Sequence, residues 1–411
     1  MAIIHTDDIP VCPRVLLAGQ IPHTRMETAL HKLQEIGKLR LYIYVRGNDE
    51  WDTLAAAIRN IRPQAMLLRP TNFEASVAVI SALDSLGTQK IVIGNLGAGK
   101  EHLALLEGHP RIEKIYHFDD QIDPSEPKDL EGGPTSVAHA TIFLAMCLRW
   151  PLHEAVILGR DKANPAGFHN LYEAFWNARL LKGTQWLCLG AGRQVRALLP
   201  LLQAYEIKKA FVWNSNPHNL WTPAKFRNVI AKIPGTARMR KNEPYVRTFD
   251  SKFEVVGVDD YREVAKTADI VSIHIRSGKN GGLSFKAGTE FLSLLKPTCH
   301  LINVARGSFV HEQDVVDAVK SRRLGGFAGD VISKKAEDDR NPEESKLWQL
   351  YQESYSGHSL LEMALPEWNI ILLPHLASST VNAFEDYDHV IARVLAHVGV
   401  LPAAKGTFKH T

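Results

Sequence analysis

The chain has 411 residues, enough for two domains, and 45% of them are hydrophobic, as in ordinary globular proteins. Its formal net charge of +3 at pH 7 is small and the basic residues are spread along the sequence, which argues against nucleic-acid binding. The N-terminal stretch lacks the basic and apolar segments of a signal peptide, and the longest apolar run, 140–148, is too short to cross a bilayer. We therefore expect neither a nucleic acid nor a membrane as a partner.

The cysteines give no sign of a disulfide framework or a metal site. None of the four forms a CxxC pair, and three of them lie in or beside apolar runs. Free thiols in a reducing compartment are the simplest interpretation, so we expect a cytoplasmic protein without a bound metal.

The first part of the chain alternates apolar strands with helical segments. This alternation predicts a parallel, doubly wound α/β sheet. The expected strands are 14–19, 41–45, 65–69, 90–95 and 112–118, and the expected helices are 24–38, 51–61 and 73–86.

A second α/β region follows a stretch, 119–134, whose Asp, Pro, Glu and Gly content indicates a linker. Its basic segment 238–246 is expected to be a loop. The closing segment 381–398 is expected to be a helix. The other expected helices are 136–149, 194–205, 312–323 and 347–355, and the expected strands are 186–189, 210–214, 255–258, 268–275, 301–305, 326–332 and 370–373.

A glycine-containing turn, Gly190-Ala191-Gly192, joins the strand 186–189 to the next helix. Such a turn lets the backbone approach a pyrophosphate at the N-terminus of a helix, although it can also be a purely structural turn. Val195 occupies the position of the third glycine of the dinucleotide motif and should push the helix away from the sheet. Pro200 should kink the same helix.

Two charged residues follow buried strands in the second region. Arg306 ends the run 301–305, and Asp330 lies in the strand 326–332. Ligands of open α/β sheets bind beyond the carboxyl ends of the strands, so both residues are placed where chemistry is expected.

Four stretches carry a resemblance to the D-isomer-specific 2-hydroxyacid dehydrogenase family. They are GAGRQV at 190–195, ADIVSIHI at 268–275, LINVARGSFVHEQDVVDAVKSRRLGGFAGDV at 301–331 and LLPHLASST at 372–380. The resemblance implies two doubly wound parallel-sheet domains, with a Rossmann cofactor domain (133–375) inserted into a flavodoxin-like substrate-binding domain (1–132 and 376–411). It also implies a homodimer.

The resemblance gives roles to individual residues. Arg306 would hold the carboxylate and carbonyl of a 2-keto acid, and His375 would be the general acid/base. A guanidinium suits a carboxylate, and an imidazole titrates in the range that proton transfer near neutral pH needs. Taken singly, Arg306 could be a strand-end salt bridge and His375 a hydrogen-bonded histidine. The expected cofactor-binding residues are Gly190, Gly192, Arg193, Gln194, Asn216, His274, Ala305 and Asp330.

The substrate-domain residues are inferred from a second glycine turn and from topology. Gly97-Ala98-Gly99 resembles the family turn whose backbone N–H groups face a carboxylate, so Ala98 and Gly99 are predicted to bind substrate. Arg69 ends a strand of the same domain and is predicted to face the same ligand, although it could be an ordinary surface arginine.

The carboxylate that the family places behind its histidine is displaced in this sequence. Its position, counted from Asp330, is Lys335, and the nearest acid is Glu337. We predict that Glu337 is the third catalytic residue.

The cofactor is expected to be NAD(P)H. The stretch 212–217, where a carboxylate normally grips the adenosine ribose, holds no acid. Lys208, Lys209, His218 and Arg276 are possible counter-charges for a 2′-phosphate, whereas Asn216 could hydrogen-bond a free hydroxyl. The balance favours NADP.

The resulting hypothesis is an NAD(P)-dependent oxidoreductase that interconverts a 2-keto acid and a D-2-hydroxy acid by hydride transfer. The alternative is an NAD(P)-binding regulatory or corepressor-like protein with little or no catalysis. Val195, Pro200 and Lys335 favour the alternative, whereas Arg306 and His375 favour the enzyme.

Overall fold

The structure is a computed structural model, and the chain divides into two compact units. Unit 1 comprises 1–133 and 380–411, and unit 2 comprises 134–379. The residues that the structure describes are 12–18, 25–44, 53–69, 76–96, 103, 105–117, 132–150, 178–214, 221–240, 243–250, 252–275, 285–331, 346–347, 349–350, 369–380, 383 and 387–402.

Unit 1 contains a five-stranded parallel sheet in the order β2-β1-β3-β4-β5. This is the flavodoxin-like order of a doubly wound sheet. The strands are β1 (Arg14–Ala18), β2 (Arg40–Tyr44), β3 (Ala65–Leu68), β4 (Ile91–Asn95) and β5 (Ile112–Tyr116).

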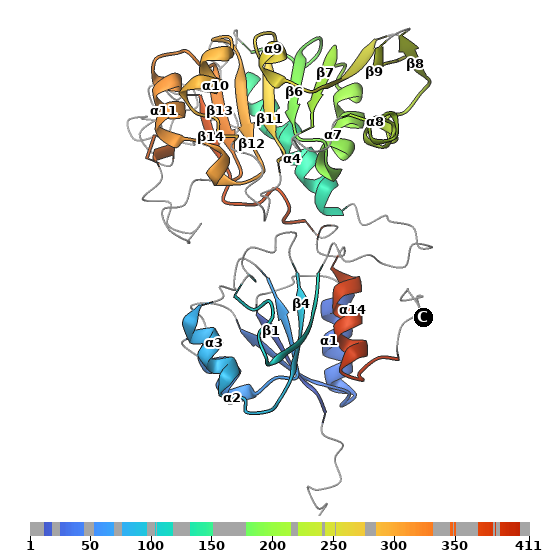
Figure 1. Ribbon diagram of the computed structural model, residues 1–411, viewed down its shortest axis with the longest axis vertical. Helices are drawn as coiled ribbons and strands as arrows, with labels where there is room; N and C mark the ends of the chain where they lie inside the picture. The colour runs from blue at the N-terminus through green and yellow to red at the C-terminus, as the bar shows by residue number, and fades with distance from the viewer. Residues whose placement is uncertain are drawn as a thin grey trace, which may run out of the picture. The chain divides into compact units, whose positions relative to one another are not determined.

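Helices cover both faces of this sheet (Figure 1). Leu16 and Ala18 pack with α2 and α3, whereas Val15 and Leu17 pack with α1 and α14. Alternate residues of a strand point to opposite faces, so a continuous apolar strand such as β1 is buried on both sides. The helices are α1 (Arg25–Glu35), α2 (Leu54–Ile61), α3 (Val77–Asp84) and α14 (Asp388–His397).

The C-terminal helix α14 belongs to unit 1 although 246 intervening residues (134–379) form unit 2. It packs closely on β4, because a Cβ added at Gly94 would lie 3.0 Å from Val394 and 3.2 Å from Val390. The chain therefore leaves unit 1, forms unit 2 and returns to unit 1.

Unit 2 contains a nine-stranded sheet in the order β14-β13-β12-β11-β6-β7-β10-β9-β8. From β14 to β10 the strands are parallel, and the order reverses between β11 and β6. This reversal is the topological switch point at which Rossmann folds bind dinucleotides. The strands are β6 (Gln185–Leu189), β7 (Lys209–Trp213), β8 (Ala237–Arg240), β9 (Glu243–Phe249), β10 (Phe253–Val258), β11 (Ile270–Ile273), β12 (His300–Asn303), β13 (Gly326–Gly329) and β14 (Ile370–Leu372).

Helices also cover both faces of the second sheet. One core contains side chains of α4, α7 and α8, and the other contains side chains of α9, α10 and α11. The two α/β sheets confirm the predicted fold class. The helices are α4 (Gly132–Arg149), α7 (Arg193–Ala204), α8 (Pro223–Ile230), α9 (Tyr261–Ala265), α10 (Thr289–Leu294) and α11 (Glu312–Lys320), with a 3-10 helix at Gly307–Phe309.

Two sequence-based expectations about elements were wrong. The segment 238–246 is not a loop: β8 and β9 form an antiparallel hairpin at the edge of the sheet. Its charged residues resemble a loop in sequence, but charges are well tolerated on edge strands. The helix α4 begins at Gly132, inside the expected linker, because Pro134 is acceptable in a first helical turn.

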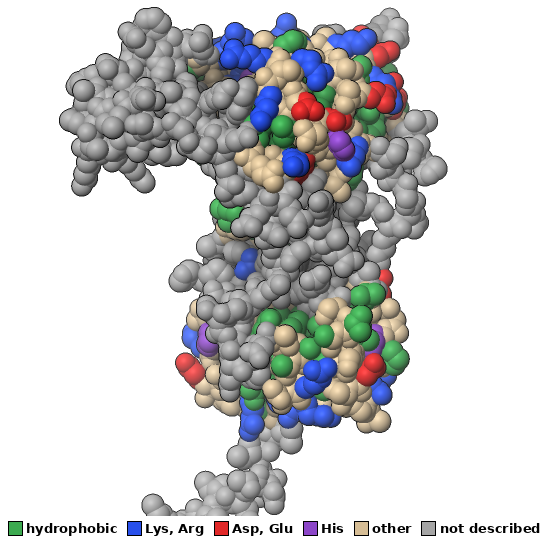
Figure 2. All heavy atoms as spheres, turned by 90° about the vertical axis from the view of Figure 1, so that its left-hand side faces the viewer, with side chains coloured by type: hydrophobic (Ala, Val, Ile, Leu, Met, Phe, Trp, Pro, Cys, Tyr) green, Lys and Arg blue, Asp and Glu red, His purple; other side chains and the backbone are tan. Residues whose placement is uncertain are grey.

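The described surface carries mixed charge. Lys and Arg side chains are interspersed with Asp and Glu side chains on the face drawn in Figure 2. No helix within the described ranges combines the length and apolarity needed to cross a bilayer.

Candidate functional site

In the glycine turn after β6, the backbone passes very close to the residue that follows the neighbouring strand β11. Gly190 has φ +124°, and a Cβ there would lie 2.7 Å from the carbonyl oxygen of His274 at the end of β11. The Gly190 N–H donates to the Trp213 carbonyl at 3.0 Å, which ties the turn to the end of β7. Only glycine fits this position.

Gly192 is a glycine for a different reason. It is the N-cap residue of α7, with φ −85°, and a Cβ added there would meet no described atom within 4 Å. Packing against the described residues therefore does not require a glycine at position 192. Without a capping side chain, the first N–H groups of α7 point into this space, where the helix dipole favours an anion. The turn fits the pyrophosphate of a dinucleotide.

The helix after the turn packs normally despite two unfavourable residues. Val195 is fully buried in the core beside α4 and the sheet, and α7 continues through Pro200 to Ala204. Neither residue prevents α7 from covering the sheet, so neither argues against a dinucleotide site.

A chain of hydrogen bonds supports the glycine turn from inside the protein. The His274 ring lies between the Gln194 amide oxygen (Nδ1···Oε1 3.3 Å) and the Ser272 hydroxyl (Nε2···Oγ 2.9 Å). The indole of Trp186 donates to the same hydroxyl at 2.8 Å. Burial lowers the pKa of His274 to about 3, so the ring is neutral at pH 7. His274 is therefore well placed to hold Gln194 and the start of α7, and its contact with a cofactor remains a prediction.

Arg306 is positioned by a buried asparagine that the sequence interpretation missed. Asn303, at the end of β12 and fully buried, accepts from the Ala305 N–H at 3.1 Å and donates to the Arg306 carbonyl at 2.8 Å. The Arg306 guanidinium donates to the Ala305 carbonyl at 2.8 Å. The sequence offered one indication of this role: Asn303 is a polar residue at the end of an apolar strand. Asparagine side chains commonly form hydrogen bonds that fix the turn that follows them.

Asp330 holds the turn that carries His375. Its Oδ1 accepts from the backbone N–H groups of Leu376 at 2.7 Å and Ala377 at 2.9 Å. His375, an exposed residue, has the left-handed conformation with φ +56°, and its N–H donates to the Leu373 carbonyl at 2.9 Å. Backbone strain of this kind is often found at functional sites.

Three predicted residues thus follow three adjacent strands. β12, β13 and β14 are paired in register, so that Asn303, Gly329 and Leu372 lie side by side. Arg306, Asp330 and His375 come one to three residues later, on the same carboxyl edge of the sheet. The backbones of β12 and β14 are two strand spacings, or roughly 10 Å, apart. A small acid could contact both a cation and an imidazole at this edge.

Several predicted residues lie in unit 1 or outside the described residues. Arg69 follows the carboxyl end of β3 in unit 1, where it is half-buried and its pKa is lowered by desolvation. Glu337, Lys335, Asn216, Ala98 and Gly99 lie outside the described residues.

Two proposed counter-charges for a 2′-phosphate are in the wrong place. Lys208 and Lys209 lie at the amino end of β7, and Lys209 pairs with Glu254 at 2.5 Å. In a Rossmann fold the adenosine ribose is expected at the carboxyl end of this strand, beyond Trp213. The sequence already indicated this placement, because both lysines precede the expected strand 210–214. His218 and Arg276 lie outside the described residues.

The described part of the chain contains no cluster of three or more His, Cys, Asp or Glu side chains suited to a metal. Cys12, Cys147, Cys188 and Cys299 are free thiols. Burial raises the pKa of both Cys188 and Cys299 to about 12, which leaves these two thiols protonated at neutral pH.

The charge of Asp330 gives a testable dependence of stability on pH. Burial raises the pKa of this carboxyl, which is only 3% exposed, to about 7, despite the two backbone donors that lower it. Between about pH 4 and pH 7 the folded state keeps a proton that the unfolded state has lost, so stability falls as the pH rises through this window. Asp330→Asn removes this effect. Relative to the wild type, the variant should gain up to about 4 kcal/mol of unfolding free energy between pH 4 and pH 8.

Chemical denaturation at a series of pH values measures this gain. The amide oxygen introduced by Asp330→Asn would still accept the two N–H groups, whereas Asp330→Ala loses the acceptor and should be destabilised at every pH. If the free energy of unfolding of the wild type and of Asp330→Asn changed with pH in parallel, the pKa of the Asp330 carboxyl would not be raised in the folded protein.

Three comparisons with known proteins agree in the kind of protein that this chain resembles. The family model described as "D-isomer specific 2-hydroxyacid dehydrogenase, NAD binding domain" matches residues 222–377, a range that contains Arg306, Asp330 and His375. A relative from Staphylococcus aureus, named "Putative 2-hydroxyacid dehydrogenase", is 23% identical over 379 residues, which are 92% of this chain and 94% of the relative. These matches point to the D-isomer specific 2-hydroxyacid dehydrogenase family, in agreement with the resemblance read from the sequence. They support the predicted class, an NAD-dependent oxidoreductase with a Rossmann domain.

Solved structures share the fold of this chain. The D-mandelate dehydrogenase of Rhodotorula graminis superposes with a TM-score of 0.62, 16% identity and 94% coverage of both chains. The NAD+ complex of D-lactate dehydrogenase from Lactobacillus jensenii gives a TM-score of 0.56 and 16% identity, covering 96% of this chain and 100% of the other. At these identities the likeness establishes the fold.

Proposed function

We propose that this protein is a member of the D-isomer specific 2-hydroxyacid dehydrogenase family and interconverts a 2-keto acid and a D-2-hydroxy acid with NAD(P) as the hydride carrier. The observation that carries the proposal is the placement of Arg306, Asp330 and His375 at the carboxyl ends of three adjacent parallel strands. The nicotinamide cofactor supplies or accepts the hydride. The protein has to bind the acid, orient its carbonyl and move one proton.

Arg306 is the proposed substrate cation. The hydrogen bond from its guanidinium to the Ala305 carbonyl and the Asn303 turn restrict its position before the substrate arrives. A fixed guanidinium can hold a carboxylate and also polarise the adjacent carbonyl. The proposed additional contacts to the acid come from Arg69, Ala98 and Gly99, and those to the cofactor come from Gly190, Gly192, Arg193, Gln194, Asn216, His274, Ala305 and Asp330.

His375 is the proposed proton donor in the direction of reduction and the acceptor in oxidation. The carbonyl oxygen needs a proton as the hydride arrives at the carbon, and a histidine can supply it near neutral pH. Asp330 would contribute by fixing the backbone of Leu376 and Ala377 directly after the histidine.

The test is the loss of reduced-cofactor absorbance with a panel of 2-keto acids, run with NADH and with NADPH. We expect turnover with at least one acid. The rival regulatory role would be supported by tight cofactor binding without turnover on any acid. Val195 and Pro200, which favoured that role in the sequence, are both accommodated within α7.

Cofactor choice is a finer proposal. The family model is one for NAD binding, and the stretch 212–217 lacks the acid that would repel a 2′-phosphate. We propose a preference for NADP, although the loss of Lys208 and Lys209 as counter-charges weakens it. A lower dissociation constant for NADH than for NADPH would contradict this preference.

Glu337 is the proposed partner of His375, and its role predicts a shift in the pH–rate profile. A nearby carboxylate raises the pKa of an imidazole, and reduction requires the protonated ring. Glu337→Gln should therefore move the decline of the reduction rate to lower pH and slow turnover at pH 7. Lys335→Gln is the matched control, because removing a nearby lysine would move the profile in the opposite direction. An unchanged profile in Glu337→Gln would exclude Glu337 as the partner.

Two further proposals concern the setting of the enzyme. We propose a homodimer, as the family resemblance implies, and a cytoplasmic location, which the free thiols suit. Sedimentation of the purified protein tests the first, and fractionation of cells tests the second.

A further inference from the structure

A cavity of 270 Å³ lies at the amino edge of the sheet in unit 2. His300 opens β12, Gly325 precedes β13 and Asn369 precedes β14, and all three line the cavity together with Arg149, Arg179 and Thr298. The proposed active site lies at the opposite, carboxyl edge of these strands. The volume is far above the roughly 10–15 Å³ that one water needs and just below the usual range of drug-sized pockets, so it suits a small ligand.

His300 gives the first indication of a ligand. The residue is only 9% exposed, and its Nδ1 is buried without a hydrogen-bond partner among the described residues. An unsatisfied buried polar atom is costly, and native proteins contain few of them. The cavity that His300 lines is the open space from which a partner could come.

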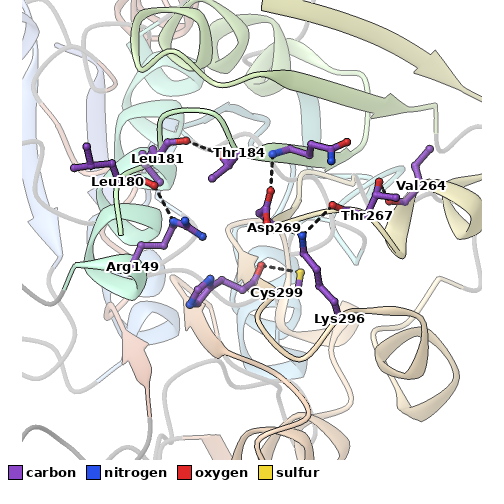
Figure 3. A network of polar contacts seen from close by, with 11 residues as sticks. Arg149, Leu180, Leu181, Thr184, Val264, Thr267, Asp269, Lys296 and Cys299 are labelled. Atoms are coloured by element: carbon purple, nitrogen blue, oxygen red, sulfur yellow. Dashed lines mark hydrogen bonds and ion pairs between the residues drawn. The ribbon is translucent and has the colours of Figure 1, made fainter. Parts of the chain in front are cut away.

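The charges around the cavity give the second indication. The Arg179 N–H donates to the Arg149 carbonyl at 2.8 Å, which brings the two arginines together, and the Arg149 Nε donates to the Leu180 carbonyl at 3.2 Å. Desolvation is the main cause that lowers the pKa of Arg149; Asp269 opposes it and Arg179 adds to it. The guanidinium of Arg149 points toward the centre of the network in Figure 3.

The neighbouring carboxylate does not neutralise this cluster. Asp269 already accepts from Lys296 at 2.6 Å and from the Gln185 N–H at 2.8 Å. Arg149, Arg179 and Lys296 are opposed by this single acid, so the described side chains carry an excess of two positive charges. Desolvation, followed by the charge of Arg149, lowers the pKa of His300 to about 4, although the backbone and the charge of Asp269 oppose the shift. A neutral ring can still donate from Nδ1 in the appropriate tautomer.

We propose that this cavity binds a small oxyanion, either a carboxylate or a phosphate, through Arg149, Arg179 and the Nδ1–H of His300. A guanidinium presents parallel N–H donors that match the oxygens of both groups. The site is separate from the keto-acid site, because His300 and Arg306 lie at opposite ends of the same strand and the turn that follows it.

The experiment is calorimetric titration of the full-length protein with inorganic phosphate and with malonate at constant ionic strength. It is done in the Arg306→Gln background, so that anion binding at the proposed catalytic site does not contribute. We expect saturable binding of at least one anion. Phosphate binding that Arg149→Gln weakens would identify a phosphate site, and malonate binding that it weakens would identify a carboxylate site.

Two variants test the residues. Arg149→Gln should weaken binding roughly ten-fold or more, because it removes charge-assisted hydrogen bonds from a half-buried donor. Arg179→Gln, an exposed position where folding is not at risk, should weaken it by roughly 1.5- to 5-fold. Arg247→Gln is a control on the remote strand β9 and should leave the affinity unchanged.

NMR of the His300 ring nitrogens should show a shift of Nδ1 on anion addition. Absence of saturable binding, or equal affinity in the Arg306→Gln parent and in both arginine variants, would overturn the proposal.

Discussion

Replacing His375 with Asn should lower kcat for keto-acid reduction by roughly 10²- to 10⁴-fold, the usual contribution of general acid catalysis. Asparagine is the appropriate substitution because His375 has φ +56°, and asparagine adopts this conformation more readily than most residues. It can form hydrogen bonds but cannot transfer a proton near neutral pH. Because the substitution removes proton transfer while sparing the turn, the dissociation constant for the reduced cofactor should stay close to that of the wild type.

Two further variants separate chemistry from folding. His375→Ala should lose activity to a similar extent, with a small additional loss of stability from the left-handed backbone. His31→Ala replaces an exposed histidine on α1 and should retain full activity. Wild-type turnover in both His375 variants would show that the proton comes from elsewhere and would remove the main support for the enzyme proposal.

The sequence was sufficient for most of the sheet architecture. Runs such as Ile270–Ile273 and His300–Asn303 are buried on both faces, and an apolar run bounded by turns is the typical sequence of a central parallel strand. The hairpin β8–β9 was missed because edge strands tolerate charge and their pattern resembles a loop. Its pairing with β10 depends on tertiary contacts such as Val246 opposite Val256.

The sequence predicted which residues form the candidate site but not the hydrogen bonds that organise them. The positions of Arg306, Asp330 and His375 follow from strand ends and family resemblance. The bonds that organise them join residues far apart in the sequence: Asp330 and Leu376 are separated by 46 positions, and Gln194 and His274 by 80. Asp330 was therefore predicted only as a cofactor contact, and its hydrogen bonds to the backbone after His375 were not foreseen.

A second large effect is expected at the glycine turn. Gly192→Asp should weaken binding of the reduced cofactor by roughly 100-fold or more. The new carboxylate would lie at the N-terminus of α7, where the pyrophosphate is expected, and like charges placed together cost several kcal/mol. The fold should tolerate the change, since a Cβ at this position meets no described atom within 4 Å. Aspartate is also a favourable N-cap, so the free energy of unfolding should rise or stay constant.

Gly192→Asn is the matched control for this prediction. Asparagine has the same shape and is an equally good N-cap, but it is neutral. A large difference in cofactor affinity between the Asp and Asn variants would therefore measure the charge of the bound group and identify it as anionic. Similar weakening in both variants would instead indicate steric exclusion. Gly190→Ala separates this local effect from damage to the fold, because its Cβ would lie 2.7 Å from the His274 carbonyl oxygen and it should lower both stability and affinity. Unchanged affinity in Gly192→Asp, measured by fluorescence titration, would place the cofactor away from this turn and leave the strand order as the main structural argument for a dinucleotide site.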